Sequence, residues 1–162
     1  MACDSSAASL ELAREKHPIA EYFQSGRPEE LISRCGPVDL IFISCVLHHI
    51  PPQERGEWLS ALGQALSPGG ATLIFEHNPW NPVTRRIFNR CQFDHGASLV
   101  YPRQCCRLLL DAGLKPVKRG FYLLSPWRNA VLDRMERMLA FVPLGGQYFV
   151  LAARLAKTAF PG

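Results

Sequence analysis

Two groups of polar side chains, each directly after an apolar segment, have the residue types best suited to chemistry in this sequence. The first group follows the run 38–43 and consists of Ser44, Cys45, His48 and His49. A histidine with an ordinary pKa of about 6.5 can accept a proton near neutral pH, so His48 or His49 is a candidate catalytic base. The alternative is that one histidine caps the next helix and the other only lines a pocket.

The second group follows the apolar run 71–75 and consists of Glu76, His77, Asn78 and Asn81. If the two runs are neighbouring parallel strands, both groups lie at the same edge of a sheet, where open α/β sheets bind ligands. These four residues are therefore candidates for a substrate-binding pocket. Asn-Pro pairs also start turns, so a purely structural role for the asparagines stays open.

A metal site can be assembled on residue type alone from His48, His77, Cys91 and His95. The separations between these residues match none of the compact spacings in which zinc ligands usually occur. The sequence therefore predicts no metal site.

An α/β framework is expected to position these groups. The run 38–43 is too continuous for a strand with one face in solvent, so it predicts a parallel strand covered by helices on both faces. Further strands are expected at 19–24, 71–75, 117–124 and 147–153. Helices are expected up to residue 17, near 29–33, from 51–52 to 66, around 83–87, at 101–110 and at 126–138.

The helix expected at 126–138 carries an apolar stripe made by Trp127, Val131, Met135 and Met138. Such a stripe usually packs on a sheet, and we expect it to do so here. The alternative is that it covers a lipid-like substrate or rests on a membrane surface.

Composition places the chain among ordinary globular domains. Its 162 residues suit one domain, and 48% hydrophobic with 20% charged residues argues against disorder. No segment is long and apolar enough to span a membrane, and the first sixteen residues do not resemble a secretory signal. The net charge of +4 is scattered along the chain, which gives no indication of nucleic-acid binding. The six cysteines form no C-x-x-C pair, so reduced thiols and a cytoplasmic location are expected.

Several phrases along the chain have a familiar order. They are Asp4-Ser-Ser, then Leu10-Glu-Leu-Ala-Arg, Val38-Asp-Leu-Ile-Phe, Val46-Leu-His-His-Ile-Pro, Leu66-Ser-Pro-Gly-Gly, Glu76-His-Asn-Pro and Pro143-Leu-Gly-Gly-Gln-Tyr. In this order they resemble the class I S-adenosylmethionine-dependent methyltransferases, especially the small-molecule group. The resemblance implies a Rossmann-like α/β sheet that ends in an antiparallel pair of strands.

The resemblance also implies a cofactor, S-adenosylmethionine, and residues that bind it. In the family an acidic residue at the end of the second strand accepts hydrogen bonds from both ribose hydroxyls, and Asp4, followed by Ser5, matches that position. The same comparison places Ser44, Cys45 and Val46 beside the methionine part of the cofactor, largely through backbone atoms.

Two parts of the family's cofactor site differ in this sequence. Arg27 stands where an acidic residue usually reads the adenine, with Glu29 or Glu30 as the alternative acid, and no glycine-rich turn is present. Residues 1–162 thus resemble a single partial methyltransferase domain, truncated at the N-terminus, that lacks the first strand, the first helix and most of the second strand. Because the first strand is central in the family's sheet order 3-2-1-4-5-7-6, we expect segment 19–24 to separate from the sheet. The strand at Val38 should then have an open edge, which favours self-association.

Two explanations for this pattern stay open: a fragment of an ordinary enzyme, or a short protein that completes its site with a partner or has lost catalysis. The resemblance implies methyl transfer to a small-molecule acceptor, with weak or no activity in the isolated chain. The alternative function is that of a non-catalytic interaction module. A hydrolase using Ser44 or Cys45 is disfavoured because the sequence lacks a G-x-S-x-G turn.

Overall fold

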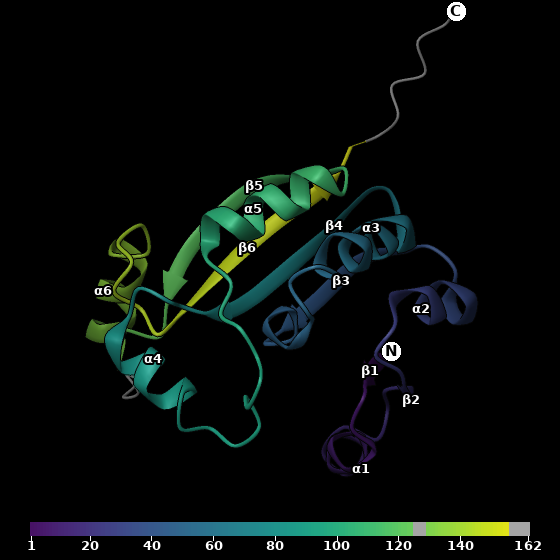
Figure 1. The fold of residues 1–162 in the computed structure, drawn as a ribbon, viewed down its shortest axis with the longest axis horizontal. Coiled ribbons are helices and arrows are strands. Elements are labelled where there is room, and N and C mark those ends of the chain that lie inside the picture. Colours follow the sequence, from purple (N-terminus) through teal and green to yellow (C-terminus); the bar gives the residue numbers. More distant parts are fainter. Residues whose placement is uncertain (125–128, 156–162) are drawn as a thin grey trace, which may run out of the picture.

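A computed structural model describes residues 1–124 and 129–155 of the chain. The strands are β1 (Ala2–Asp4), β2 (Tyr22–Gln24), β3 (Val38–Ser44), β4 (Leu66–His77), β5 (Leu114–Tyr122) and β6 (Gln147–Arg154). The helices are α1 (Ala7–Lys16), α2 (Pro28–Cys35), α3 (Arg55–Ala65), α4 (Pro82–Phe88), α5 (Pro102–Asp111) and α6 (Ala130–Met138), with a short 3-10 helix η1 (Leu47–His49). Strands and helices alternate through most of the chain, which confirms the predicted α/β class (Figure 1).

Four strands form the main sheet in the order β3-β4-β6-β5. Strands β3 and β4 are parallel, while β6 runs antiparallel to both β4 and β5. The predicted antiparallel pair at the end of the chain is therefore confirmed. The register places Ser44 opposite Phe75, so the carboxyl ends of β3 and β4 lie side by side.

Strands β1 and β2 form a separate parallel pair, with Asp4 opposite Gln24. The expected separation of segment 19–24 is thus confirmed, although the strand covers only its second half and Ile19 is 98% exposed. Helix α1 follows β1 and begins after Ser6, whose hydroxyl accepts a hydrogen bond from the backbone N–H of Ser9. Figure 1 shows these three elements beside the main sheet.

The core lies between one face of the main sheet and the helices α3 and α5, which pack against each other and against that face (Figure 1). Its largest fully buried apolar side chains are Leu47, Leu59, Leu66, Ile74, Leu109 and Leu114. Helix α5 shows why the sequence folds this way. Pro102 occupies its first turn, Cys105 and Leu109 are buried four residues apart, and Gly113 follows the helix with φ of 77°.

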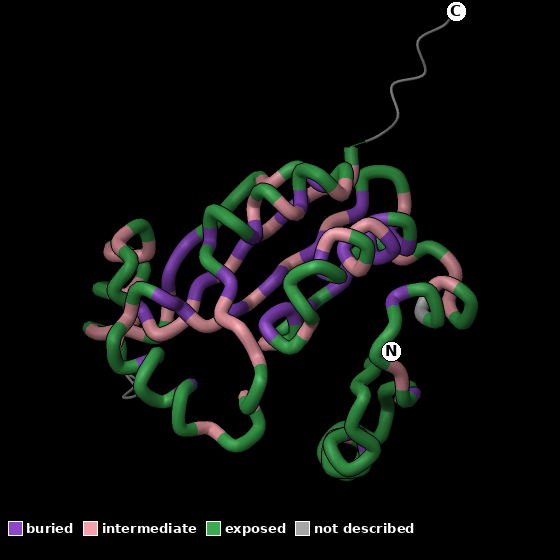
Figure 2. The backbone as a smooth tube through the Cα atoms, viewed as in Figure 1, coloured by how far each residue is buried: buried purple, intermediate pink, exposed green. Residues whose placement is uncertain are grey.

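The opposite face of β3 is open, which contradicts the prediction that helices cover both faces of this strand. Leu40 and Phe42 are each 62% exposed, whereas Ile41 and Ile43 on the other face are buried. The reason is that α3 and α5 both cover the same face of the sheet (Figures 1 and 2). An apolar run in the sequence shows what a strand could bury, not what is available to cover it.

Strand β4 begins earlier than the predicted 71–75 and starts at Leu66. Segment 67–70, read from the sequence as loop, lies within the strand as an irregularity in its pairing with β3. At Gly70 an added Cβ would lie 3.1 Å from the carbonyl oxygen of Asp39, so this close approach favours glycine. Helix α3 begins at Arg55, after the two prolines expected to start it.

The apolar stripe of α6 does not pack on the sheet, which contradicts the expectation from its spacing. Val131, Met135 and Met138 are 68, 44 and 66% exposed, and the helix has no buried residue. Trp127 lies outside the described residues. No helix in the described ranges combines the length and apolarity needed to cross a membrane.

Candidate functional site

The turn after β3 bends sharply at Cys45, which has a positive φ of 55°. This conformation is uncommon for a residue with a Cβ and is often found at functional sites. The N–H of Cys45 donates to the carbonyl of Phe75 over 2.9 Å, so the ladder with β4 extends to the bend. Burial, with the charge of Glu76, raises the pKa of the Cys45 thiol to about 11, so this cysteine is not an activated nucleophile.

Glu76 and His48 form the buried centre of the site. The side chain of Glu76 is 1% exposed and that of His48 is 0% exposed. His48 Nδ1 lies 2.6 Å from Glu76 Oε2, while the other carboxylate oxygen accepts a hydrogen bond of 2.7 Å from the N–H of Leu47. Burial lowers the pKa of His48, but the hydrogen bond and charge of Glu76, helped by Asp94, raise it overall. Glu76 therefore fixes η1 and the ring of His48.

Asp94 joins this centre from the loop between α4 and α5, and the sequence analysis did not identify it. Its Oδ1 lies 3.4 Å from His48 Nε2 and 3.5 Å from His49 Nε2. The ring of His77 lies 5.0 Å from that of His48, centroid to centroid. Burial and the neighbouring His48 lower the pKa values of His49 and His77. Three imidazoles and two carboxylates thus meet at the ends of β3 and β4.

Asp4 is the last residue of β1, and Ser5 follows it. Asp4 Oδ1 accepts a hydrogen bond of 2.8 Å from the N–H of Ser6, and the Asp4 side chain is exposed. Its charge raises the pKa of His49, as the smallest of several effects on that ring. The Ser5 carbonyl accepts a hydrogen bond from Gln24. Asp4 at the end of β1 and His49 after β3 therefore lie near enough to interact electrostatically.

Comparisons with known proteins give one consistent result. A family model described as a methyltransferase domain matches residues 1–70, and no curated protein sequence matches the chain. A SAM-dependent methyltransferase from Archaeoglobus fulgidus superposes with a TM-score of 0.66 at 18% identity, covering 93% of this chain and 74% of that one. The described part of the chain therefore has the fold of these methyltransferases.

Other solved structures agree with this assignment. A SAM-dependent methyltransferase from Thermotoga maritima, described as a possible histamine N-methyltransferase, has a TM-score of 0.66 at 12% identity and covers 94% of this chain and 72% of its own. The N-methyltransferase NodS from Bradyrhizobium japonicum, solved with S-adenosylhomocysteine, has a TM-score of 0.59 at 12% identity. It covers 94% of this chain and 64% of its own. At these identities the likeness defines the fold.

The predicted pocket residues Asn78 and Asn81 make hydrogen bonds that join distant parts of the fold. Asn78 Nδ2 donates to the carbonyls of Pro143 and Gly145, over 3.0 and 2.7 Å, and its Oδ1 accepts from the N–H of Trp80. Asn81 caps α4 and donates to the carbonyl of Leu144. These bonds support the turn-forming alternative for both asparagines. The bonds of Asn78 also join the segment Glu76-His-Asn-Pro to the segment Pro143-Leu-Gly-Gly-Gln-Tyr, two of the phrases that carry the resemblance.

Arg55 is a second residue that sequence reasoning missed. It is 1% exposed, and its guanidinium donates to the carbonyls of Leu47, Ile50 and Ser98 and to the Ser98 hydroxyl. In addition, the N–H of Ser98 donates to the carbonyl of His48. Arg55 therefore ties the turn after β3 to the loop that carries Asp94. A single arginine at the start of a helix gives no signal of this role.

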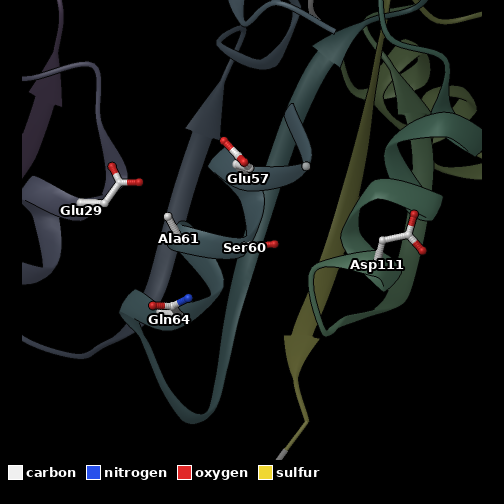
Figure 3. A pocket seen from close by; sticks show the side chains of 7 residues that line it. Glu29, Glu57, Ser60, Ala61, Gln64 and Asp111 are labelled. Atoms are coloured by element: carbon white, nitrogen blue, oxygen red, sulfur yellow. The ribbon is translucent and has the colours of Figure 1, made fainter. Parts of the chain in front are cut away.

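A surface hollow lies elsewhere in the described structure. It is lined by α2, α3 and α5, with Glu29, Glu57 and Asp111 among its residues (Figure 3). All three acidic side chains are exposed, and none is near the carboxyl ends of β3 and β4. The histidine cluster, and not this hollow, is the candidate functional site.

Proposed function

We propose that this chain serves S-adenosylmethionine-dependent methyl transfer to a small-molecule acceptor. The observation that carries the proposal is the position of Asp4, whose exposed carboxylate ends β1 as the ribose-binding acid of the family would. The match of residues 1–70 to a methyltransferase domain supports it. A carboxylate can accept hydrogen bonds from two neighbouring hydroxyls, which suits a ribose.

The turn after β3 would line the methionine end of the cofactor. Ser44, Cys45 and Val46 provide backbone groups there, and the bend at Cys45 turns the chain away from the strand end. Methyl transfer from a sulfonium is a direct displacement, so these residues need only orient the reacting groups. No nucleophilic side chain is required, in agreement with the raised pKa of the Cys45 thiol.

Of the predicted catalytic histidines, His49 is the better placed to accept a proton from a bound acceptor. Its side chain is 44% exposed, whereas that of His48 is 0% exposed and held by Glu76. His77 is the predicted pocket residue whose side chain is not used in a hydrogen bond between described residues, and we assign it to the acceptor side. Glu76 acts as a positioning residue.

Calorimetric titration with S-adenosylmethionine and S-adenosylhomocysteine tests this proposal. Asp4→Asn should weaken binding by about ten- to a hundredfold, because hydrogen bonds to a charged group contribute about 1.5–3 kcal/mol. Asp39→Asn is the control, since Asp39 is also exposed but lies at the opposite end of β3. Equal effects of the two substitutions would contradict the proposed role of Asp4.

The second candidate is an interaction module, favoured by the exposed apolar face of β3 at Leu40 and Phe42. The same titration separates the two functions. If the chain alone does not bind either compound, a glycine-rich first strand and helix from a related methyltransferase should be joined to its N-terminus. Restored binding supports the enzyme, and continued failure supports the interaction module. A cytoplasmic location is part of the same proposal and rests on the absence of any C-x-x-C pair among the six cysteines of the sequence.

A further inference from the structure

Within the candidate site, ring nitrogens of two histidines and one carboxylate oxygen lie close together, and the hydrogen bonds between described residues leave one of these nitrogens without a partner. We propose that His48, His77 and Asp94 form a binding site for a divalent first-row transition-metal ion, with Zn²⁺ as the representative. Each residue offers one ligand atom, and the three atoms lie within 4.8 Å of one another. The proposal is independent of methyl transfer, because it concerns binding of the ion alone.

The first argument is the unpartnered nitrogen of His48. Its Nε2 is buried and has no hydrogen-bond partner in the described structure. His48 Nδ1 faces Glu76 at 2.6 Å, which fixes the proton on Nδ1 and leaves a lone pair on Nε2. The nearest charged group to this nitrogen among the printed contacts is Asp94, whose Oδ1 lies 3.4 Å away. When Nε2 carries no proton, two acceptors lie beside each other in a largely buried site, and a cation bound by both would stabilise this arrangement.

The second argument is the distance between these two acceptors. A protonated Nε2 would donate to a carboxylate over about 2.7–2.9 Å, but Nε2 and Asp94 Oδ1 are 3.4 Å apart. Zinc bonds to nitrogen and oxygen of about 2.0–2.1 Å in a tetrahedral site put neighbouring ligand atoms about 3.3 Å apart. The observed separation therefore fits two ligands of one ion. The imidazole of His77, from the end of β4, completes the set by an inward shift of at most about 1.5 Å.

Glu76 supplies the outer support that such sites require. Histidine ligands usually donate their second ring N–H to a carboxylate, which orients the ring and makes the ligating nitrogen more basic. Here the carboxylate is itself fixed by the N–H of Leu47 at 2.7 Å. Arg55 holds the main chain on both sides of the cluster, at Leu47 and at Ser98. The His48 part of the site is therefore held in place before any ion arrives.

The ligand types identify the class of ion. Two imidazoles and one carboxylate suit Zn²⁺, Fe²⁺ and Co²⁺ better than Mg²⁺ or Ca²⁺, which prefer all-oxygen sites. Three protein ligands leave at least one coordination position for water or another molecule. Among the described residues, Asp94 has ion-pair contacts only with His48 and His49, so its charge is compensated by no lysine or arginine.

The test is titration of the chelator-treated full chain with Zn²⁺ by calorimetry and with Co²⁺ by absorption spectroscopy. We expect one ion per chain and a visible Co²⁺ spectrum typical of nitrogen and oxygen ligands. Asp94→Asn and His77→Gln should each weaken binding at least about tenfold. His95→Gln is the matched control, because His95 is exposed and adjacent to the same loop residue but outside the cluster.

Three outcomes would overturn the proposal. They are binding of less than one ion per five chains, equal loss in His95→Gln and Asp94→Asn, and a sulfur-to-cobalt charge-transfer band, which would assign the ion to cysteine ligands. Circular dichroism shows whether each variant folds. If Asp94→Asn does not fold, His77→Gln and the Co²⁺ spectrum of the unmodified chain decide the question.

Discussion

Replacing Glu76 by glutamine tests the buried centre of the domain directly. The substitution keeps the size and shape of the side chain but removes its charge. Glutamine can still accept a hydrogen bond from the N–H of Leu47 through its oxygen. Its amide group would instead donate to Nδ1 of His48, which moves the ring proton to Nε2. The result is a neutral contact in place of a charged one and a histidine with the opposite tautomer.

The size of the effect follows from the two hydrogen bonds. Bonds to a charged group contribute about 1.5–3 kcal/mol, and neutral ones about 0.5–1.5 kcal/mol, so each bond should lose about 1 kcal/mol. Glu76→Gln should therefore lower the free energy of unfolding by about 2 kcal/mol. Glu76→Ala leaves the N–H of Leu47 without a partner and should cost about 4 kcal/mol.

Urea unfolding measures these changes. With a slope of about 2 kcal/mol per molar urea, Glu76→Gln should lower the midpoint by about 1 M, and Glu57→Gln on the exposed face of α3 by less than about 0.3 M. Nitrogen NMR of the imidazole should show the proton of His48 on Nδ1 in the unmodified chain and on Nε2 in Glu76→Gln. A midpoint within about 0.3 M of the unmodified chain, with an unchanged tautomer, would refute the reasoning.

Three further predictions concern other parts of the molecule. Gly145→Ala should destabilise the domain by more than about 2 kcal/mol in the same urea assay, because an added Cβ would collide with the backbone of Tyr122; an unchanged midpoint would contradict this. Because the pKa of Cys45 is raised to about 11, only about one Cys45 thiol in a thousand is ionised at pH 8. The rate of its alkylation, followed by mass spectrometry, should therefore keep rising up to pH 10, and a plateau below pH 9 would disprove the raised pKa. The exposed face of Leu40 and Phe42 at the edge of the sheet should promote self-association, seen in light scattering as an apparent mass that grows with concentration. Phe42→Glu should restore the monomer, and a monomeric unmodified chain would rule the idea out.

The strands and the position of the site could be predicted from local pattern. The apolar runs ending at Ile43 and Phe75 identified β3 and β4, and polar residues directly after them gave the edge where the histidines meet. Separation of segment 19–24 followed from the family's sheet order, not from the segment itself.

Asp94 and Arg55 could not be found in this way. Residue type alone suggested Cys91 and His95, on either side of Asp94, as ligands. Which side chain of a loop turns inward depends instead on where the ends of the loop are anchored. Arg55 is charged, and charged residues are rarely fully buried unless they are paired, so sequence alone places it in solvent. Exposure of Phe42 was missed for the opposite reason, because an apolar residue was assumed to be covered.

The position of β6 has a consequence for how the chain acquires its structure. The last described strand lies between β4 and β5, which precede it in the sequence, and contributes the buried residues Tyr148, Val150 and Ala152. Until residues 147–154 have left the ribosome, β5 therefore has no neighbouring strand and β4 is paired only with β3. During synthesis both would present unpaired apolar edges, the state in which chaperones bind and aggregation begins. Slow formation of these distant contacts, and not the helices, should set the rate at which the domain folds.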